Sequence, residues 1–226
     1  MKRSQVNSSI LWAMDLLKKH SFSLPDFAFW KEDDWRKNKD KTGTIKKVML
    51  GWDVTDYGLD SFEKIGGVLF TIRNGNQEDR SIGVPYAEKV LLFKEGQGLP
   101  AHFHYCKTED IINRGGGVLA LKLYNALHDG EMDLVNDVVV YMDGIRNVVG
   151  PGDVVKVYPG NSITLTPYMY HNFWALEGYG DLVAGEVSSV NDDNQDNHFY
   201  KNLPRFGSIE EDEPKFCPLV AEYCNL

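Results

Sequence analysis

Residues 96–116 read GQGLPAHFHYCKTEDIINRGG. Within them, a single residue separates His102 from His104, and a β-strand points alternate side chains to the same face, so both imidazoles can reach one ion. Glu109 lies five residues after His104 and cannot share that face on one regular strand. The stretch therefore predicts a strand, then a turn or bulge that brings the Glu109 carboxylate back toward the histidines.

The spacing of these residues is more specific than the histidine pair alone. Gly96, five residues, His102-x-His104, four residues, Glu109, six residues and Gly116 together resemble the first motif of the cupin superfamily at every position. A second, looser match runs from Gly160 through Pro167 to His171, where Tyr168-Met169-Tyr170 replaces the family's x-Gly step. An isolated His-x-His pair more often faces solvent, but these motifs favour a metal site formed by His102, His104, Glu109 and His171.

The texture of the chain from about residue 48 onward agrees with this fold. Short runs rich in Val, Leu, Ile, Tyr and Phe alternate with Gly, Asn, Asp and Pro, as in all-β barrels and sandwiches. Asp143-Gly144 separates two such runs and suits a two-residue hairpin turn. The runs predict strands at residues 48–53, 68–73, 89–93, 101–105, 118–124, 138–142, 145–149, 154–158, 162–165, 172–176 and 182–187.

We therefore expect an all-β fold, the double-stranded antiparallel β-helix (jelly-roll barrel) of the cupins, with an N-terminal helical extension. A single domain of residues 1–226 would comprise a helical and aromatic extension at 1–45, the barrel at 46–190 and a C-terminal extension at 191–226. Ser4 is expected to cap a first helix that Pro25 ends. The apolar stripe of this helix comprises Val6, Ile10, Ala13, Met14 and Leu17. An aromatic stretch follows and is expected to cover a core or to reach a partner subunit; it contains Phe27, Phe29, Trp30 and Trp35.

Composition restricts the class of partner. The 226 residues carry a formal net charge of -9, which argues against nucleic acid as the main ligand. No uninterrupted apolar run resembles a signal peptide or a membrane span, so we expect a cytoplasmic protein without a membrane partner. The three cysteines contain no CxxC pair and are expected to be reduced thiols.

The expected ligand set also restricts the chemistry. Three imidazoles and one carboxylate suit manganese, iron, cobalt, nickel or zinc better than calcium, and do not choose among them. In octahedral geometry four protein ligands leave two adjacent positions open. These can take the neighbouring oxygens of a hydroxy-carbonyl substrate, or dioxygen and one substrate atom, so isomerase and oxygenase chemistry both remain open.

Beyond the cupin motifs, a further set of segments spans nearly the whole chain: LGWDVTD at 50–56, PYAEK at 85–89, HFH at 102–104, EDIINRGGG at 109–117, YH at 170–171, GEVS at 185–188, VNDD at 190–193 and DN at 196–197. In these segments the chain resembles the D-lyxose isomerase family. The resemblance implies interconversion of D-lyxose and D-xylulose, often with D-mannose and D-fructose as secondary substrates, manganese as the usual metal, and a homodimer.

Aldose–ketose isomerisation needs a base, a Lewis acid and a group that returns a proton to oxygen. Glu186 follows the apolar run 182–185, at a position where a barrel strand would point its side chain to the interior, and is the expected base. The alternative is that Glu186 lies at the surface or pairs with a lysine. Lys89 and Lys107 are candidates to donate to substrate oxygens, although most lysines are solvated. A cis-enediolate stabilised by the metal and a hydride shift both remain open.

A polar segment after Glu186 is expected to bind the substrate. Asp192, Asp193 and Asp196 suit sugar hydroxyls, with an Asx-rich turn as the alternative. Arg205 is expected to anchor that loop or to reach the substrate. The partner would be a small neutral monosaccharide. Three rivals remain: a metal-dependent cupin dioxygenase, a non-catalytic sugar-binding cupin, and an isomerase of phosphorylated sugars, for which the motifs lack a basic cluster.

Overall fold

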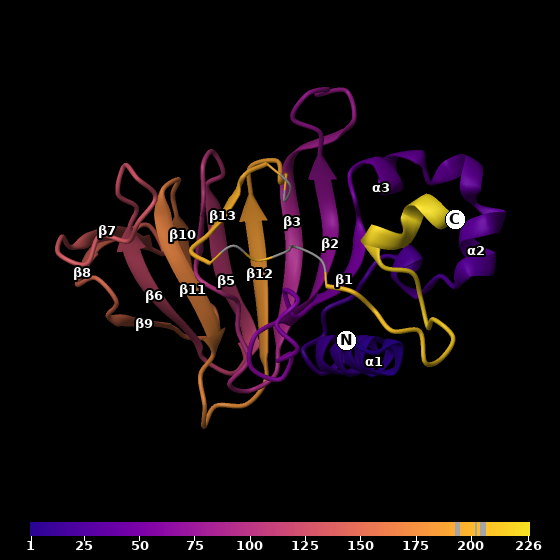
Figure 1. Ribbon diagram of the computed structural model, residues 1–226, viewed down its shortest axis with the longest axis horizontal. Helices are drawn as coiled ribbons and strands as arrows, with labels where there is room; N and C mark the ends of the chain where they lie inside the picture. Colours follow the sequence, from indigo (N-terminus) through magenta and orange to yellow (C-terminus); the bar gives the residue numbers. More distant parts are fainter. Residues whose placement is uncertain (193–194, 202, 204–206) are drawn as a thin grey trace.

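A computed structural model describes residues 1–192, 195–201, 203 and 207–226. Within these residues two antiparallel sheets pack face to face (Figure 1). The larger sheet contains, in spatial order, β1 (Gly51–Thr55), β2 (Gly67–Gly75), β3 (Gly83–Phe93), β12 (Leu182–Ser188), β5 (Glu109–Gly116), β10 (Ser162–Leu165), β7 (Val138–Met142) and β8 (Ile145–Val149). The smaller sheet contains β13 (Asn197–Phe199), β4 (His102–His104), β11 (Met169–Ala175), β6 (Leu119–Asn125) and β9 (Val154–Val157).

The strand order confirms the predicted all-β class and jelly-roll arrangement. Strands distant in sequence are neighbours in space, since β12 pairs with β3 and β5 while β11 pairs with β4 and β6. Side chains from both inner faces fill the space between the sheets. This inner core includes Leu91, Phe93, Ile111, Leu121, Phe173 and Leu182.

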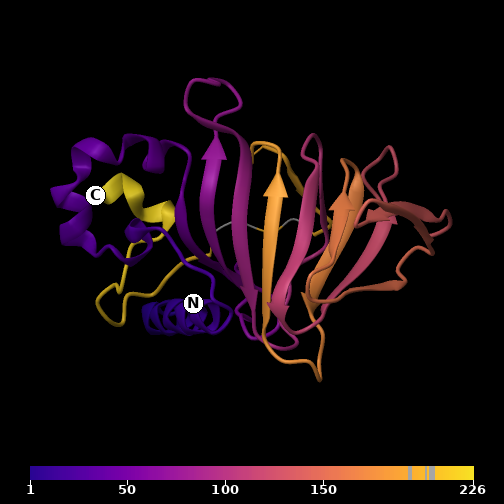
Figure 2. The ribbon, with the colours of Figure 1, turned by 180° about the vertical axis from the view of Figure 1, so that it is seen from behind.

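The helices gather beside β1 at one end of the larger sheet, and α1 packs against the outer face of β2 and β3 (Figure 2). They are α1 (Arg3–Lys19), η1 (Asp26–Phe29), α2 (Glu32–Lys37), η2 (Lys39–Lys41), α3 (Gly43–Lys47) and η3 (Val220–Asn225). None of the described helices combines the length and apolar character needed to cross a membrane. A second core joins the α1 residues Val6, Ile10 and Leu17 to Val68, Phe70, Val90 and Leu92. Where β2 and β3 are buried on both faces, at residues 68–70 and 90–93, their sequences are continuously apolar rather than alternating.

The ends of the first helix differ from the sequence expectation. Its N-cap is Lys2, and Ser4 lies inside the first turn, where its backbone N–H and hydroxyl donate to Asp212 at 2.9 and 2.7 Å. The helix stops at Lys19, well before Pro25, which instead caps η1. The Ser4 cap and the Pro25 stop were therefore wrong, because a tertiary contact engages Ser4 and the chain turns at Ser21, which has a φ of 55°.

The aromatic segment after α1 packs on this side of the fold. The ring of Phe27 lies 5.4 Å from that of Phe70, and Trp35 lies 4.6 Å from Tyr223. These contacts confirm that the aromatic stretch covers a core. Phe29 is the exception, with 53% of its surface exposed.

Most predicted strands are present, and the Asp143-Gly144 hairpin is confirmed. Met142 pairs with Ile145, and the two turn residues have φ values of 50° and 79°, as a type I′ turn requires. Two strands were missed. Glu109–Gly116 follows the predicted turn or bulge but was not itself predicted as a strand, and it pairs with β12. Asn197–Phe199 lies in the segment expected to be a polar loop, yet pairs with β4. Both strands are poor in apolar residues because they line a polar end of the barrel.

The two ends of the chain are joined by a buried arginine. Arg3 has no exposed surface, and its guanidinium donates to both carboxylate oxygens of Glu211 at 2.7 and 2.9 Å. It also pairs with Glu222, which Lys215 contacts at 3.0 Å. The hydrogen bonds from Arg3 hold the pKa of Glu211 below its ordinary value of 4.5. The carboxylate therefore stabilises the fold above that pKa and loses this effect as the pH falls through the lower folded pKa.

Arg3→Met should lower the free energy of unfolding at neutral pH by about 1–3 kcal/mol, because the exposed Glu211 and the half-buried Glu222 lose their buried cation. The difference from the wild-type protein should shrink as the pH falls below 4.5 and through the lowered folded pKa of Glu211, because protonation removes the charge that Arg3 pairs with. Urea unfolding across this pH range measures it. Arg36→Met, which removes two exposed ion pairs of α2, is the control and should leave stability unchanged. A difference that is the same at every pH would contradict the assigned role of Glu211.

Candidate metal centre and active site

Three histidines meet at one end of the space between the sheets. His102 and His104 lie at the two ends of β4, and His171 lies on β11 directly opposite His102. All three are buried, and one ring nitrogen from each lies within 4.8 Å of the others. The strand period therefore places the His102 and His104 rings on one face, as the sequence predicts.

Backbone carbonyls determine the orientation of two of these rings. Nδ1 of His102 lies 2.8 Å from the Pro100 carbonyl, and Nδ1 of His171 lies 3.0 Å from the Met169 carbonyl. A carbonyl oxygen only accepts, so both Nδ1 atoms must carry the proton and both Nε2 atoms must be unprotonated in the neutral rings. Such carbonyl contacts are typical of metal-ligating histidines.

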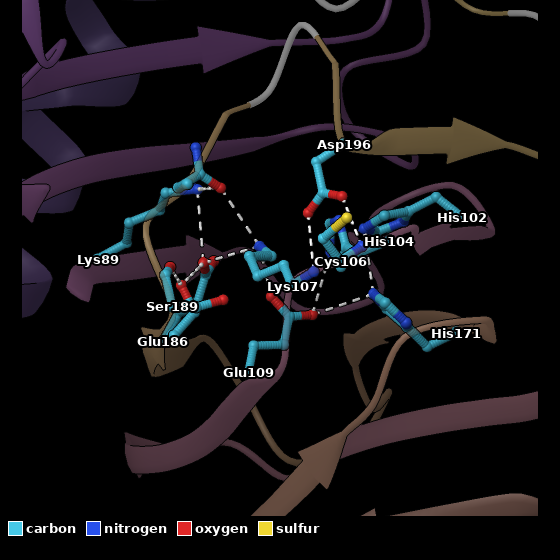
Figure 3. A network of polar contacts seen from close by, with 12 residues as sticks. Lys89, His102, His104, Cys106, Lys107, Glu109, His171, Glu186, Ser189 and Asp196 are labelled. Atoms are coloured by element: carbon cyan, nitrogen blue, oxygen red, sulfur yellow. Dashed lines mark hydrogen bonds and ion pairs between the residues drawn. The ribbon is translucent and has the colours of Figure 1, made fainter. Parts of the chain in front are cut away.

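Glu109 returns to the same point after the turn between β4 and β5 (Figure 3). Its Oε1 lies 3.2 Å from Nε2 of His171 and 3.4 Å from Nε2 of His104, while its Oε2 lies 2.7 Å from Nζ of Lys107. Glu109 begins β5 in the larger sheet, whereas the histidines belong to the smaller one. The four side chains thus bridge the two sheets.

The electrostatics of the cluster favour neutral rings beside a carboxylate anion. Burial lowers the pKa of His102 well below its ordinary value, and the neighbouring histidines lower it further. Burial, followed by the charge of Lys107, also lowers the pKa of His104. Burial opposes ionisation of Glu109, yet Lys107 and His104 hold the pKa of this carboxyl well below its ordinary value.

The arrangement fits a bound cation. Nε2 of His102 and Nε2 of His171 are 3.1 Å apart, and two unprotonated nitrogens at this distance repel each other unless a positive charge lies between them. Neither ring nitrogen of His104 has a hydrogen-bond partner among the described residues, which is costly for a buried polar group. Nitrogens that bind one ion at about 2.1 Å can lie about 3 Å apart, and the 3.1 Å between these two nitrogens agrees with that spacing.

Comparison with known proteins agrees with this chemistry. A family model described as D-lyxose isomerase matches residues 1–223. The chain belongs to the D-lyxose isomerase family. Two relatives named D-lyxose/D-mannose isomerase, from Escherichia coli O157:H7 and Serratia proteamaculans, are each 42% identical to it, over 99% and 100% of this chain and 98% and 99% of their own.

A solved structure supports the fold at greater distance. The L-ribose isomerase of Acinetobacter sp. DL28, determined in complex with L-ribose, superposes with a TM-score of 0.60 at 14% identity. The match covers 93% of this chain and 98% of the neighbour. This chain and the L-ribose isomerase therefore share one fold.

The predicted catalytic residues lie on the inner face of the larger sheet. Glu186 on β12 is directly opposite Lys89 on β3, and both are 5% exposed. Lys107, in the turn before β5, is 3% exposed and lies 3.0 Å from Oε1 of Glu186 through its Nζ. The structure therefore brings Glu186, Lys89 and Lys107 together beside Glu109, and their catalytic roles stay predictions.

The predicted substrate-binding residues are spread more widely. Asp192 lines a cavity of about 230 Å³ that shares Lys89 as a wall with the metal pocket. Asp196 is buried, and its two carboxylate oxygens accept from the backbone N–H groups of Cys106 and Lys107 at 2.7 and 3.0 Å. These bonds hold the turn that carries Lys107. Asp193 and Arg205 lie outside the described residues.

Sequence reasoning did not single out several residues around the metal pocket, which has a volume of about 40 Å³. The ring of Phe199 lies 5.4 Å from that of His102 and 5.4 Å from that of Tyr57. Asn197, which the sequence placed in the polar segment after Glu186, lies opposite His104 on β13 and also lines the pocket. Recognition of 197–199 as a strand beside β4 would have indicated these positions.

His171→Ala and Glu109→Ala should each weaken metal binding at least about tenfold, because each removes a donor from the cluster. Metal content after dialysis, measured by elemental mass spectrometry, tests this. His128→Ala, at an exposed position in a turn, is the matched control. Full metal occupancy in either ligand variant would show that the ion is held elsewhere.

Proposed function

We propose that this protein is a metal-dependent aldose–ketose isomerase that interconverts D-lyxose and D-xylulose. The observation that carries the proposal is one buried chain of contacts. Glu186 Oε1, Lys107 Nζ and Glu109 Oε2 follow one another at 3.0 and 2.7 Å, so the expected base is linked directly to the expected ligand set. The names of the two relatives that are 42% identical over their full lengths support the choice of substrate.

The four side chains of the cluster would hold the metal. His102, His104 and His171 supply neutral nitrogens and Glu109 an anionic oxygen, a set that suits a divalent transition metal. A divalent ion bound there would supply Lewis acidity toward the carbonyl oxygen of the sugar. Lys107 contacts Glu109 from the other side and keeps the carboxyl ionised.

Glu186 is the group we assign to proton transfer. In the forward direction its carboxylate removes the proton from C2 of the aldose, the C–H electron pair forms the C1–C2 double bond, and the carbonyl pair moves onto O1. Glu186 then returns the proton to C1. A proton passes from O2 to O1, and O2 becomes the carbonyl of the ketose. A carboxylate buried within a barrel has the restricted access to water that such a transfer requires.

Lys89 and Lys107 flank this carboxylate and would donate hydrogen bonds to the sugar oxygens. Their Nζ atoms lie 3.5 and 3.0 Å from Oε1 of Glu186. Ammonium groups held in a buried site stabilise negative charge that develops on oxygen far better than water does. Asp192, Asp193 and Asp196 remain our proposed substrate-binding segment, with Arg205 as its anchor.

Further features of the proposal rest on the family resemblance. We propose manganese as the resident metal, D-mannose and D-fructose as secondary substrates, and a homodimer as the working form. The division into an extension at 1–45, a barrel at 46–190 and a C-terminal extension at 191–226 also remains a proposal, in which β13 links the last segment to the barrel. Three free thiols agree with a cytoplasmic location.

Conversion of D-lyxose to D-xylulose by the purified protein tests the function. Activity should vanish after chelation and return when manganese is added in the absence of oxygen, because the sugar needs the Lewis acid and the reaction needs no oxidant. Failure with confirmed metal, followed by failure on a panel of free and phosphorylated sugars, would reject the isomerase. Oxygen uptake with an iron-loaded protein would then favour the dioxygenase, and sugar binding without turnover would favour a binding protein.

Glu186→Gln should lower kcat by about 10²–10⁴-fold while metal content stays at the wild-type level, because the amide cannot accept the C2 proton. Glu88→Gln is the matched control, since Glu88 precedes Lys89 on β3 and pairs with Arg73 on the neighbouring strand. Because the proton held on Glu186 exchanges in part with solvent before one returns to C1, reaction in heavy water should place some deuterium at C1 of the ketose. Complete retention of the substrate hydrogen would instead indicate a hydride shift and remove the role assigned to Glu186.

A further inference from the structure

Two lysines of like charge share one carboxylate oxygen in the active site (Figure 3). Nζ of Lys89 and Nζ of Lys107 both contact Oε1 of Glu186, and both side chains are almost fully buried. A lysine side chain is flexible, and its ammonium group is a point charge without a preferred plane. Ion pairing alone therefore leaves the direction of the N–H donors open, so other acceptors must orient them.

Asn191 supplies such an acceptor for both lysines. Its Oδ1 lies 2.8 Å from Nζ of Lys89 and 3.3 Å from Nζ of Lys107. The contact to Lys89 is shorter than the 3.5 Å between Lys89 and Glu186. An amide oxygen accepts hydrogen bonds without adding a third negative charge beside Glu109 and Glu186.

The backbone of Asn191 is itself held by the larger sheet. Asn74, a buried residue near the end of β2, donates through Nδ2 to the Asn191 carbonyl at 3.1 Å and accepts from the Asn191 N–H at 3.0 Å. This paired contact resembles one rung of a β-ladder. Asn74 also donates to the Val48 carbonyl at 3.2 Å, and Gln77 donates to the Val190 carbonyl at 3.1 Å.

From these contacts we propose that Asn191 is a positioning residue that directs the ammonium groups of Lys89 and Lys107 toward the substrate, and that Asn74 holds Asn191 in place. The expected loss of activity rests on the proposed isomerase function, whereas the contacts of Asn191 do not depend on it. An apolar residue at 191 would remove the acceptor that the two lysines share, so that Lys89 turns toward Glu186 and Lys107 is held by Glu109 and Glu186 alone among the contacts described above. An aspartate would keep the acceptor but pair with the lysines as an additional anion.

The test combines kinetics with a labelling measurement that does not depend on turnover. Asn191→Leu should lower kcat for D-lyxose at least about tenfold, since misplaced catalytic groups carry costs of this order, while metal content and KM change little. Brief acetylation with acetic anhydride, followed by peptide mapping, should show faster modification of Lys89 and Lys107 in this variant. Asn147→Ala is the matched control, because the Asn147 side chain donates to the Ile145 carbonyl of its own strand β8 at 2.8 Å, away from the active site.

Conservative variants separate positioning from a general effect on folding. Asn191→Asp should keep both lysines as protected from acetylation as in the wild type, because the acceptor remains. Asn74→Ala should increase labelling at the two lysines, with a smaller loss of kcat than Asn191→Leu. Unchanged labelling in Asn191→Leu, or faster labelling with kcat unchanged, would overturn the proposal.

Failure of the isomerase proposal would give a different pattern. The wild-type protein would then convert no sugar, yet the protection of the two lysines and its loss in Asn191→Leu would still be measurable. Loss of protection in that case would support the positioning contact and reject only the assigned reaction.

Discussion

Nε2 of His102 and Nε2 of His171 face each other across 3.1 Å at one end of the barrel. Between neutral rings whose Nε2 atoms lack a proton, this contact is favourable only with a cation between them. Each ring is tied through Nδ1 to a carbonyl two residues earlier in the chain. The backbone of β4 and β11 therefore directs both Nε2 atoms toward one point.

The charges around this contact are balanced without the metal. Glu109 and Glu186 contribute two negative charges, while Lys89 and Lys107 contribute two positive ones, and the four groups touch one another. Burying ions in balanced and hydrogen-bonded groups avoids most of the desolvation penalty that a single charge would suffer. A divalent metal then leaves an excess of positive charge. Such a site suits a neutral substrate that acquires negative charge on its oxygens during the reaction.

The sequence predicts those features of the site and the fold that depend on the local backbone conformation alone. His102 and His104 share a face because a strand alternates, and the Asp143-Gly144 turn forms because both residues accept positive φ. At Tyr168, where the family motif departs, the backbone still has a φ of 60° despite the missing glycine. The Tyr168 N–H donates to the His104 carbonyl at 2.9 Å, so a contact between ligand strands maintains this conformation. Such compensation is invisible in the spacing of one motif.

The unpredicted part depends on contacts between segments distant in the sequence. β5 carries the polar side chains of Glu109 and Asn113 toward the interior. Its sequence therefore lacks the apolar–polar alternation that identifies a half-buried strand, although burial alternates along it. Asn113 is buried because its side chain donates to the Gly117 and Val157 carbonyls at 2.9 Å, a partnership that only the folded chain provides. The same holds for the segment after β12, where Asn191 contacts the lysines, Asp196 holds the Lys107 turn, and Asn197 and Phe199 line the metal pocket. Because this segment leaves the larger sheet and joins the smaller one as β13, the pairing that closes the pocket also positions the groups around it.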